Sequence, residues 1–189
     1  MILPAMVRRL RILLPLLCCA PAALRAQGAS LPPLGFLGFE AGQSLGMVGR
    51  TVRALGGRGL HCDRSRRDRA VLECRASVVD PVSRRPLDLW LSAIDSTTGV
   101  MTLSSPLSGV ELDTWRSGLE NAFGVVDANV QGRQWMLQWV RQGRMLRLTW
   151  RIDNGAKIAS VSLVDGHVLD GWGRRRENSG TATRVKGEK

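Results

Sequence analysis

The sequence contains the same order of local patterns twice, and this order limits the folds that the chain can adopt. An amphipathic helix pattern, with apolar residues at i, i+3, i+7 and i+10, begins at Leu45 and again at Leu112. One shift of 67 residues aligns the two apolar stripes, and each stripe ends at glycine. Ser108 and Glu111 form the capping box that is typical of a helix start. The spacing predicts helices over residues 44–55 and 108–123.

Four segments of strand-like sequence, separated by polar turns, follow each predicted helix. In the first half the segments are residues 59–63, 70–78, 86–95 and 99–105, and in the second half 126–131, 134–141, 144–153 and 157–164. The sequence therefore predicts an α+β fold of two tandem repeats, each with one helix followed by a four-stranded antiparallel meander. The helices would pack on one face of the sheet. Chance similarity between two helix-and-sheet halves is the alternative to a duplication.

The first 26 residues have the pattern of an export signal. Arg8, Arg9 and Arg11 precede a short apolar run, and cleavage is expected after Ala26 or Gly28. The run is too short to span a bilayer, so we expect no membrane span in the mature chain. The chain then divides into an export signal (1–26), a linker and the segment leading into the domain (27–40), a first repeat (41–107), a second repeat (108–172) and a disordered basic tail (173–189). We expect a periplasmic or extracellular protein.

The net charge of +11 lies mainly at the two ends of the chain. The export signal holds four arginines and no acid, and the tail from Gly173 holds six basic residues and two acids. The predicted folded body carries about +3, with 17 basic and 14 acidic residues. This distribution, together with export, argues against a nucleic-acid partner.

Two cysteines remain after removal of the export signal, Cys62 and Cys74. They flank an Arg- and Asp-rich segment that has the pattern of a hairpin tip. In an oxidising compartment two such cysteines most simply pair, which would stabilise the fold by roughly 2–3 kcal/mol through loop closure. Redox or metal chemistry at this pair is the alternative.

The helix-and-meander layout resembles the β-lactamase-inhibitor-protein-like repeat fold. The segment Gly42-Gln43-Ser44-Leu45, with Val52 and Leu55-Gly56 after it, is also similar to the opening of small bacterial envelope proteins with that fold. These include the small lipoprotein of the outer-membrane barrel-assembly machinery. Gln43 stands where those proteins usually have Met, and the lipid-anchoring cysteine of the lipoproteins is missing. The resemblance implies a non-catalytic protein-binding module.

The sequence carries no catalytic signature, and we predict no catalytic residue, no metal ligand and no cofactor. It contains only two histidines, His61 and His167, and no ligand spacing, nucleophile elbow or phosphate-binding loop. A small enzyme built around His167 and Asp165 is one alternative function. A solvated polar turn explains the same two residues.

Strand alternation assigns side chains to the two faces of the predicted sheet. The face opposite the helices would carry a set of aromatic, apolar and basic side chains: Arg75, Trp90, Met136, Val140, Arg147 and Arg151. Trp and Arg are enriched at protein interfaces, so we predict that this face binds another envelope or extracellular protein. An ordinary solvated sheet face is the alternative. The remaining strand and helix tryptophans are expected in the core: Trp115, Trp135, Trp139 and Trp150.

Two basic clusters give a further candidate function. The predicted anion-binding residues are Arg64, Arg66, Arg67 and Arg69 at the hairpin tip and Arg174, Arg175 and Arg176 in the tail. Guanidinium groups bind phosphates and carboxylates through paired hydrogen bonds. These residues would bind an anionic lipid or polymer. The aspartates between the tip arginines favour a self-neutralised loop instead.

Overall fold

The computed structural model describes residues 31–153 and 156–174. The predicted export signal, the first part of the linker and the tail beyond Arg174 lie outside the described residues. The same holds for two of the predicted anion-binding residues, Arg175 and Arg176.

One eight-stranded antiparallel sheet dominates the described part of the chain. Its strands are β3 (His61–Arg64), β4 (Val71–Val79), β5 (Pro86–Ile94), β6 (Thr97–Leu107), β7 (Asn129–Gln131), β8 (Gln134–Arg141), β9 (Arg144–Asp153) and β10 (Ala156–Asp165). The strand order is β3-β4-β5-β6-β10-β9-β8-β7, so two meanders meet where β6 pairs with β10. A separate two-stranded hairpin, β1 (Gly35–Phe36) and β2 (Phe39–Glu40), precedes the first helix.

The two predicted helices are confirmed as α1 (Leu45–Ala54) and α2 (Gly109–Phe123). Ser44 begins α1 by accepting a hydrogen bond from the Met47 backbone N–H. The capping box of Ser108 and Glu111 is present at the start of α2. The apolar stripes are buried through Val48 and Val52 of α1 and Leu112, Trp115 and Leu119 of α2.

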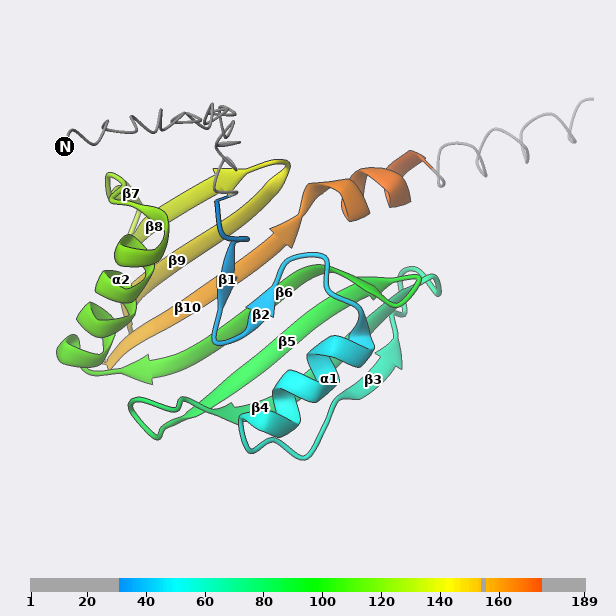
Figure 1. The fold of residues 1–189 in the computed structure, drawn as a ribbon, viewed down its shortest axis with the longest axis horizontal. Coiled ribbons are helices and arrows are strands. Elements are labelled where there is room, and N and C mark those ends of the chain that lie inside the picture. The colour runs from blue at the N-terminus through cyan, green and yellow to red at the C-terminus, as the bar shows by residue number, and fades with distance from the viewer. Residues whose placement is uncertain (1–30, 154–155, 175–189) are drawn as a thin grey trace, which may run out of the picture. The chain divides into compact units, whose positions relative to one another are not determined.

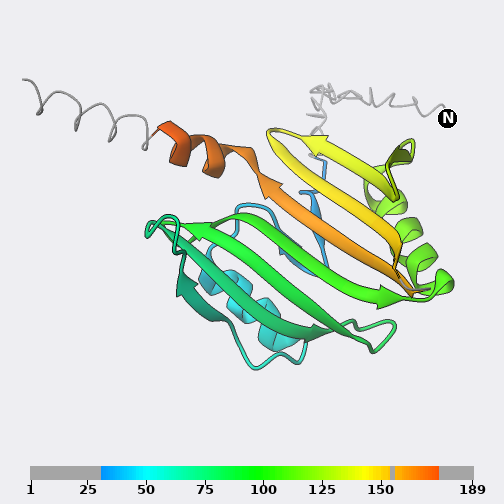
Figure 2. The same ribbon diagram turned by 180° about the vertical axis from the view of Figure 1, so that it is seen from behind.

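Both helices lie over the same face of the sheet (Figure 1). From behind, no helix of the described residues crosses the opposite face (Figure 2). The core forms between the helices and the alternate apolar residues of the strands, such as Leu89, Leu103, Leu148 and Val161. An α+β fold with a large antiparallel sheet is therefore established.

A third helix occupies residues 166–174, where we expected a polar turn and the start of the tail. Asp165 caps it, because its Oδ1 accepts a hydrogen bond from the Val168 backbone N–H at 3.1 Å. Leu169 packs against Gly99 of β6, where a Cβ atom would lie 2.9 Å from the leucine side chain. The expectation of a solvated turn around His167 is therefore wrong, because tertiary packing on β6 supports a helix that glycine-rich sequence disfavours.

The four tryptophans expected in the core divide into two pairs. Trp115 and Trp139 are buried. Trp135 and Trp150 are only half-buried and stack across β8 and β9, with ring centres 6.4 Å apart and planes inclined by 8°. Ile152, on the same side of β9, is 48% exposed. The helices therefore leave this end of the sheet face that they cover partly open to solvent.

Candidate functional site

The open sheet face carries a continuous row of side chains across the middle strands. Pairing aligns Arg75 with Trp90, Trp90 with Thr102, and Thr102 with Ser162. Ser162 in turn faces Arg147 on β9. Three of the predicted partner-binding residues therefore share one row, although they come from positions far apart in the sequence.

Small hydroxyl side chains fill the centre of this face. Thr102 Oγ1 lies 3.0 Å from Ser162 Oγ, and Thr149 Oγ1 lies 2.8 Å from Ser160 Oγ. These two hydrogen-bonded pairs separate the predicted residues into two groups. Arg75 and Trp90 lie on the β4–β5 side, and the others lie on the β8–β9 side: Met136, Val140, Arg147 and Arg151.

Arg147 is held in place within the second group. Its Nε and Nη2 atoms both donate to Gln138 Oε1, at 3.0 and 2.7 Å. Its side chain is half-buried, and the amide oxygen that it contacts carries no formal charge, so this contact does not neutralise the guanidinium. Arg151 is exposed and lies 3.6 Å from the carboxylate of Asp153. This second group thus presents one fixed and one solvent-exposed cation.

The hairpin tip is fastened to the third helix. Trp172 Nε1 donates to Asp68 Oδ2 at 3.0 Å, and Asp68 Oδ1 accepts from the Ala70 backbone N–H at 2.9 Å. Arg64 closes the tip by donating to the Arg69 carbonyl oxygen at 2.7 Å. The structure therefore brings the tip close to the helix over residues 166–174, which the sequence did not indicate.

Acidic side chains lie beside the exposed arginines of the hairpin tip. A cavity of about 660 Å³ at the tip is lined by three arginines, two acids and Ser65. The arginines among them are Arg64, Arg66 and Arg67, and the acids are Asp63 and Glu73. Arg69 and Arg174 are exposed outside this cavity. The tip combines both charge signs, which weakens its attraction for an anion.

His167 and Asp165 have structural contacts and do not bond to one another in the described ranges. Asp165 Oδ2 pairs with Arg144 Nε at 2.8 Å, and its carboxylate is almost completely buried. His167 Nε2 lies 3.0 Å from the Gln142 carbonyl oxygen. The two residues therefore fix the Gln142–Gly143 turn and the start of the third helix.

Cys62 and Cys74 lie directly opposite each other on β3 and β4 and form the predicted disulfide. Cys74 is fully buried in the core. The bond thus ties the short edge strand β3 to the sheet.

An apolar groove beside α2 has no counterpart in the sequence predictions. It has a volume of about 520 Å³ and lies between α2, the β1–β2 hairpin and the loop after β4. Its aromatic lining consists of Phe36, Trp115 and Phe123. Val82 and Val110 at the groove are 72% and 77% exposed. The sequence gives only a weak signal for this groove, because Val82 belongs to a turn and Val110 lies off the predicted apolar stripe.

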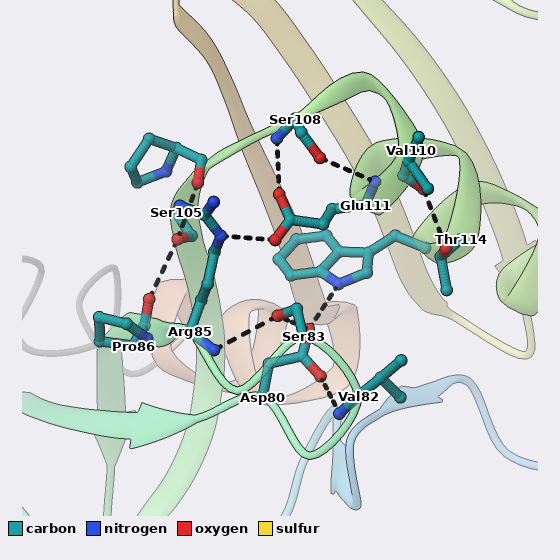
Figure 3. A network of polar contacts seen from close by, with 12 residues as sticks. Asp80, Val82, Ser83, Arg85, Pro86, Ser105, Ser108, Val110, Glu111 and Thr114 are labelled. Atoms are coloured by element: carbon teal, nitrogen blue, oxygen red, sulfur yellow. Dashed lines mark hydrogen bonds and ion pairs between the residues drawn. The ribbon is translucent and has the colours of Figure 1, made fainter.

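Asp80 lines the groove and is only 2% exposed. Burial raises the pKa of its carboxyl group, but hydrogen bonds from the Val82 backbone, Trp115 Nε1 and Ser83 outweigh this and hold the pKa below its ordinary value. The donor–acceptor distances are 2.9 Å from Val82 N, 3.1 Å from Trp115 Nε1 and 2.9 Å from Ser83 Oγ (Figure 3). Asp80 is therefore an ionised carboxylate at neutral pH.

Glu111 forms a second polar contact beside the groove (Figure 3). The Ser108 backbone N–H, the Ser108 side chain and Arg85 lower the pKa of its carboxyl group. Arg85 Nε pairs with Glu111 Oε1, which links the loop after β4 to the first turn of α2. Glu111 thus has a cationic partner, whereas no ion pair in the described residues involves Asp80.

Comparison with protein-family models, with curated proteins and with solved structures gives no match for this chain. Among residues 31–153 and 156–174, no group of three or more His, Cys, Asp or Glu side chains is placed to hold a metal ion. Over the same ranges, no helix has the length and apolar character needed to cross a bilayer.

Proposed function

We propose that the protein is an exported, non-catalytic module that binds another envelope or extracellular protein through its open sheet face. The observation that carries this proposal is a row of side chains on a face that no helix within residues 31–153 and 156–174 covers. The row consists of Arg75, Trp90, Thr102, Ser162 and Arg147. Trp and Arg are the residue types most enriched at interface hot spots.

The shape of the face also supports a protein partner. The Ser and Thr side chains at its centre are short, whereas Trp90 and Arg147 on either side are long. A partner segment lying over the centre would contact both long side chains at once. The hydroxyl pairs already satisfy one another, so burying them beneath a partner leaves few unpaired polar groups.

We also propose that the two helix-and-meander halves form a tandem repeat of the β-lactamase-inhibitor-protein-like kind. The order α1-β3-β4-β5-β6 followed by α2-β7-β8-β9-β10 supports this proposal. So does the sheet order, in which the two meanders run outward from the β6–β10 pair.

Capture on matched variants tests the binding proposal. The mature chain (residues 29–189) is immobilised, exposed to envelope proteins and washed at high salt. We expect one protein that the wild type retains and the Trp90→Ala/Arg147→Glu variant loses. The control is Trp135→Ala/Arg58→Glu, which exchanges the same residue types away from the open face. Equal loss in the control would contradict the proposal.

A second candidate function is binding of an anionic lipid or polymer through the hairpin tip and the tail. The Asp68–Trp172 contact favours it, because it holds the tip arginines near the helix over residues 166–174, which includes Arg174. The salt dependence of binding separates the two candidate functions, because contacts between exposed charges weaken as ionic strength rises.

A further inference from the structure

The groove beside α2 has the size and lining of a small-molecule site. Its volume of about 520 Å³ falls within the range of roughly 300–1,000 Å³ that is usual for ligand pockets. Leu37, Leu119 and Ala122 add aliphatic surface to its three aromatic rings. Phe36 and Trp115 pack edge to face with ring centres 4.9 Å apart, so part of this lining is fixed by contacts within the fold.

A buried negative charge distinguishes this groove from an ordinary apolar depression. The hydrogen bonds to the Asp80 carboxylate come from neutral donors: the Val82 backbone N–H, the Ser83 hydroxyl and the Trp115 indole N–H. These donors offset the cost of burying the carboxylate, but they supply no opposite charge. Asp80 therefore leaves the groove with an uncompensated negative charge, because the neighbouring Arg85 is already paired with Glu111.

The aromatic lining of the groove also favours a positively charged ligand. The faces of aromatic rings attract cations. One ring of the groove already does so, because the Arg141 guanidinium lies 5.6 Å from the centre of the Phe123 ring. A ligand cation inside the groove would be attracted both by the rings and by Asp80.

We propose that this groove binds a small organic cation, an ammonium group carried on an apolar body, with the body against Trp115 and Phe36 and the cation facing Asp80. The site is separate from the open sheet face, because it lies on the side of the sheet that carries the helices. Its failure would leave the proposed protein-binding function untouched.

Ligands that share one apolar body and differ in charge test this proposal. The probes are 3-phenylpropylammonium, 3-phenylpropan-1-ol and 4-phenylbutanoate, titrated at pH 7 while the indole N–H resonance of Trp115 is followed by NMR. We expect the ammonium to bind about tenfold more tightly than the alcohol, and the carboxylate to bind most weakly. No change at the Trp115 resonance, or an equal affinity for all three probes, would overturn the proposal.

Two variants locate the site and its charge. Asp80→Asn should reduce the preference for ammonium over alcohol to within about twofold. Gly118→Leu should weaken both probes, because Gly118 lines the groove and a Cβ atom there meets nothing within 4 Å. Ser117→Leu, an exposed neighbour outside the groove lining, is the control and should bind like the wild type. If Asp80→Asn does not fold, unchanged binding in Gly118→Leu would still overturn the proposal.

Discussion

Trp90 and Arg147 lie in one cross-strand row of the open sheet face, with Thr102 and Ser162 between them. Three strand spacings separate the two side chains, which corresponds to about 14 Å. An α-helix with its side chains is about 10–12 Å across. A single partner segment seated on the hydroxyl pairs could therefore touch both residues.

Substitution of tryptophans on the two faces should affect stability differently. Trp139 is 3% exposed and donates to the Gly124 carbonyl oxygen at 2.7 Å. Trp139→Ala should lower the free energy of unfolding by about 3–5 kcal/mol, because it leaves a cavity and an unpaired carbonyl. Trp90→Ala, at a half-buried site, should cost less than about 2 kcal/mol. Urea unfolding measures both values, and equal losses would place Trp90 in the core.

Removal of the disulfide should destabilise the fold without changing its topology. The bond between Cys62 and Cys74 closes a loop with a sequence separation of 12 residues. Cys62→Ala/Cys74→Ala should lower the free energy of unfolding by about 3 kcal/mol, mainly because the unfolded chain gains freedom. Urea unfolding of the variant and of the oxidised wild type gives the difference. A change near zero would mean that the bridge does not restrict the unfolded chain as expected.

Asp80 should make stability depend on pH in the acid range. Its folded pKa lies below the ordinary value of 3.8, so the folded state binds fewer protons than the unfolded state there. The resulting stabilisation is complete above the unfolded pKa and is lost as the pH falls through the folded pKa. Glu111 contributes in the same direction, because its pKa is also lowered.

Unfolding curves recorded from pH 6 down to about pH 2.5, for the wild type and for Asp80→Asn, should separate the contribution of Asp80 to stability from that of Glu111. Asp80→Asn should be less stable at neutral pH, because the amide nitrogen cannot accept the hydrogen bonds that the carboxylate accepts. Its stability should also fall less steeply below about pH 4 than that of the wild type. Identical slopes for the two proteins would contradict the account of Asp80.

If the hairpin tip and the tail bind anions, the protein should be retained on an anionic surface in a salt-dependent way, and changes to these two clusters should reduce that retention. Deleting residues 174–189 together with Arg66→Gln, Arg67→Gln and Arg69→Gln should lower the salt concentration that elutes the protein from an anionic surface. The matched control carries the same deletion with three arginines changed elsewhere: Arg53→Gln, Arg58→Gln and Arg116→Gln. Equal elution of the two variants would show that only net charge matters, and that the tip is not a binding site.

Local periodicity was sufficient to predict the main elements of the described structure. The two-layer packing buries apolar residues that recur at helical spacing in the helices and at alternate positions in the strands. Helices α1 and α2 and the strands of both meanders could therefore be predicted from these patterns. The disulfide also follows, because Cys62 and Cys74 flank one hairpin. Assignment of Trp90 and Arg147 to the face opposite the core required only alternation.

Features that depend on distant contacts could not be predicted in this way. The helix over residues 166–174 contains three glycines and is supported by packing of Leu169 on Gly99. Asp80 resembles an ordinary turn residue, and its burial depends on Trp115, which lies 35 residues further along the chain. The groove beside α2 combines three separate segments, so no single stretch of sequence carries its pattern.

Contact between the open face and a partner can be measured most directly by site-specific photo-crosslinking. A photoreactive phenylalanine analogue replaces Ser162, at the centre of the row, or Ser117, on the exposed surface of α2. The account predicts that Ser162 crosslinks to one envelope protein, that Ser117 does not, and that Arg147→Glu abolishes the crosslink. The same crosslinks from both positions, or none from Ser162, would contradict the proposal that this face is the binding surface.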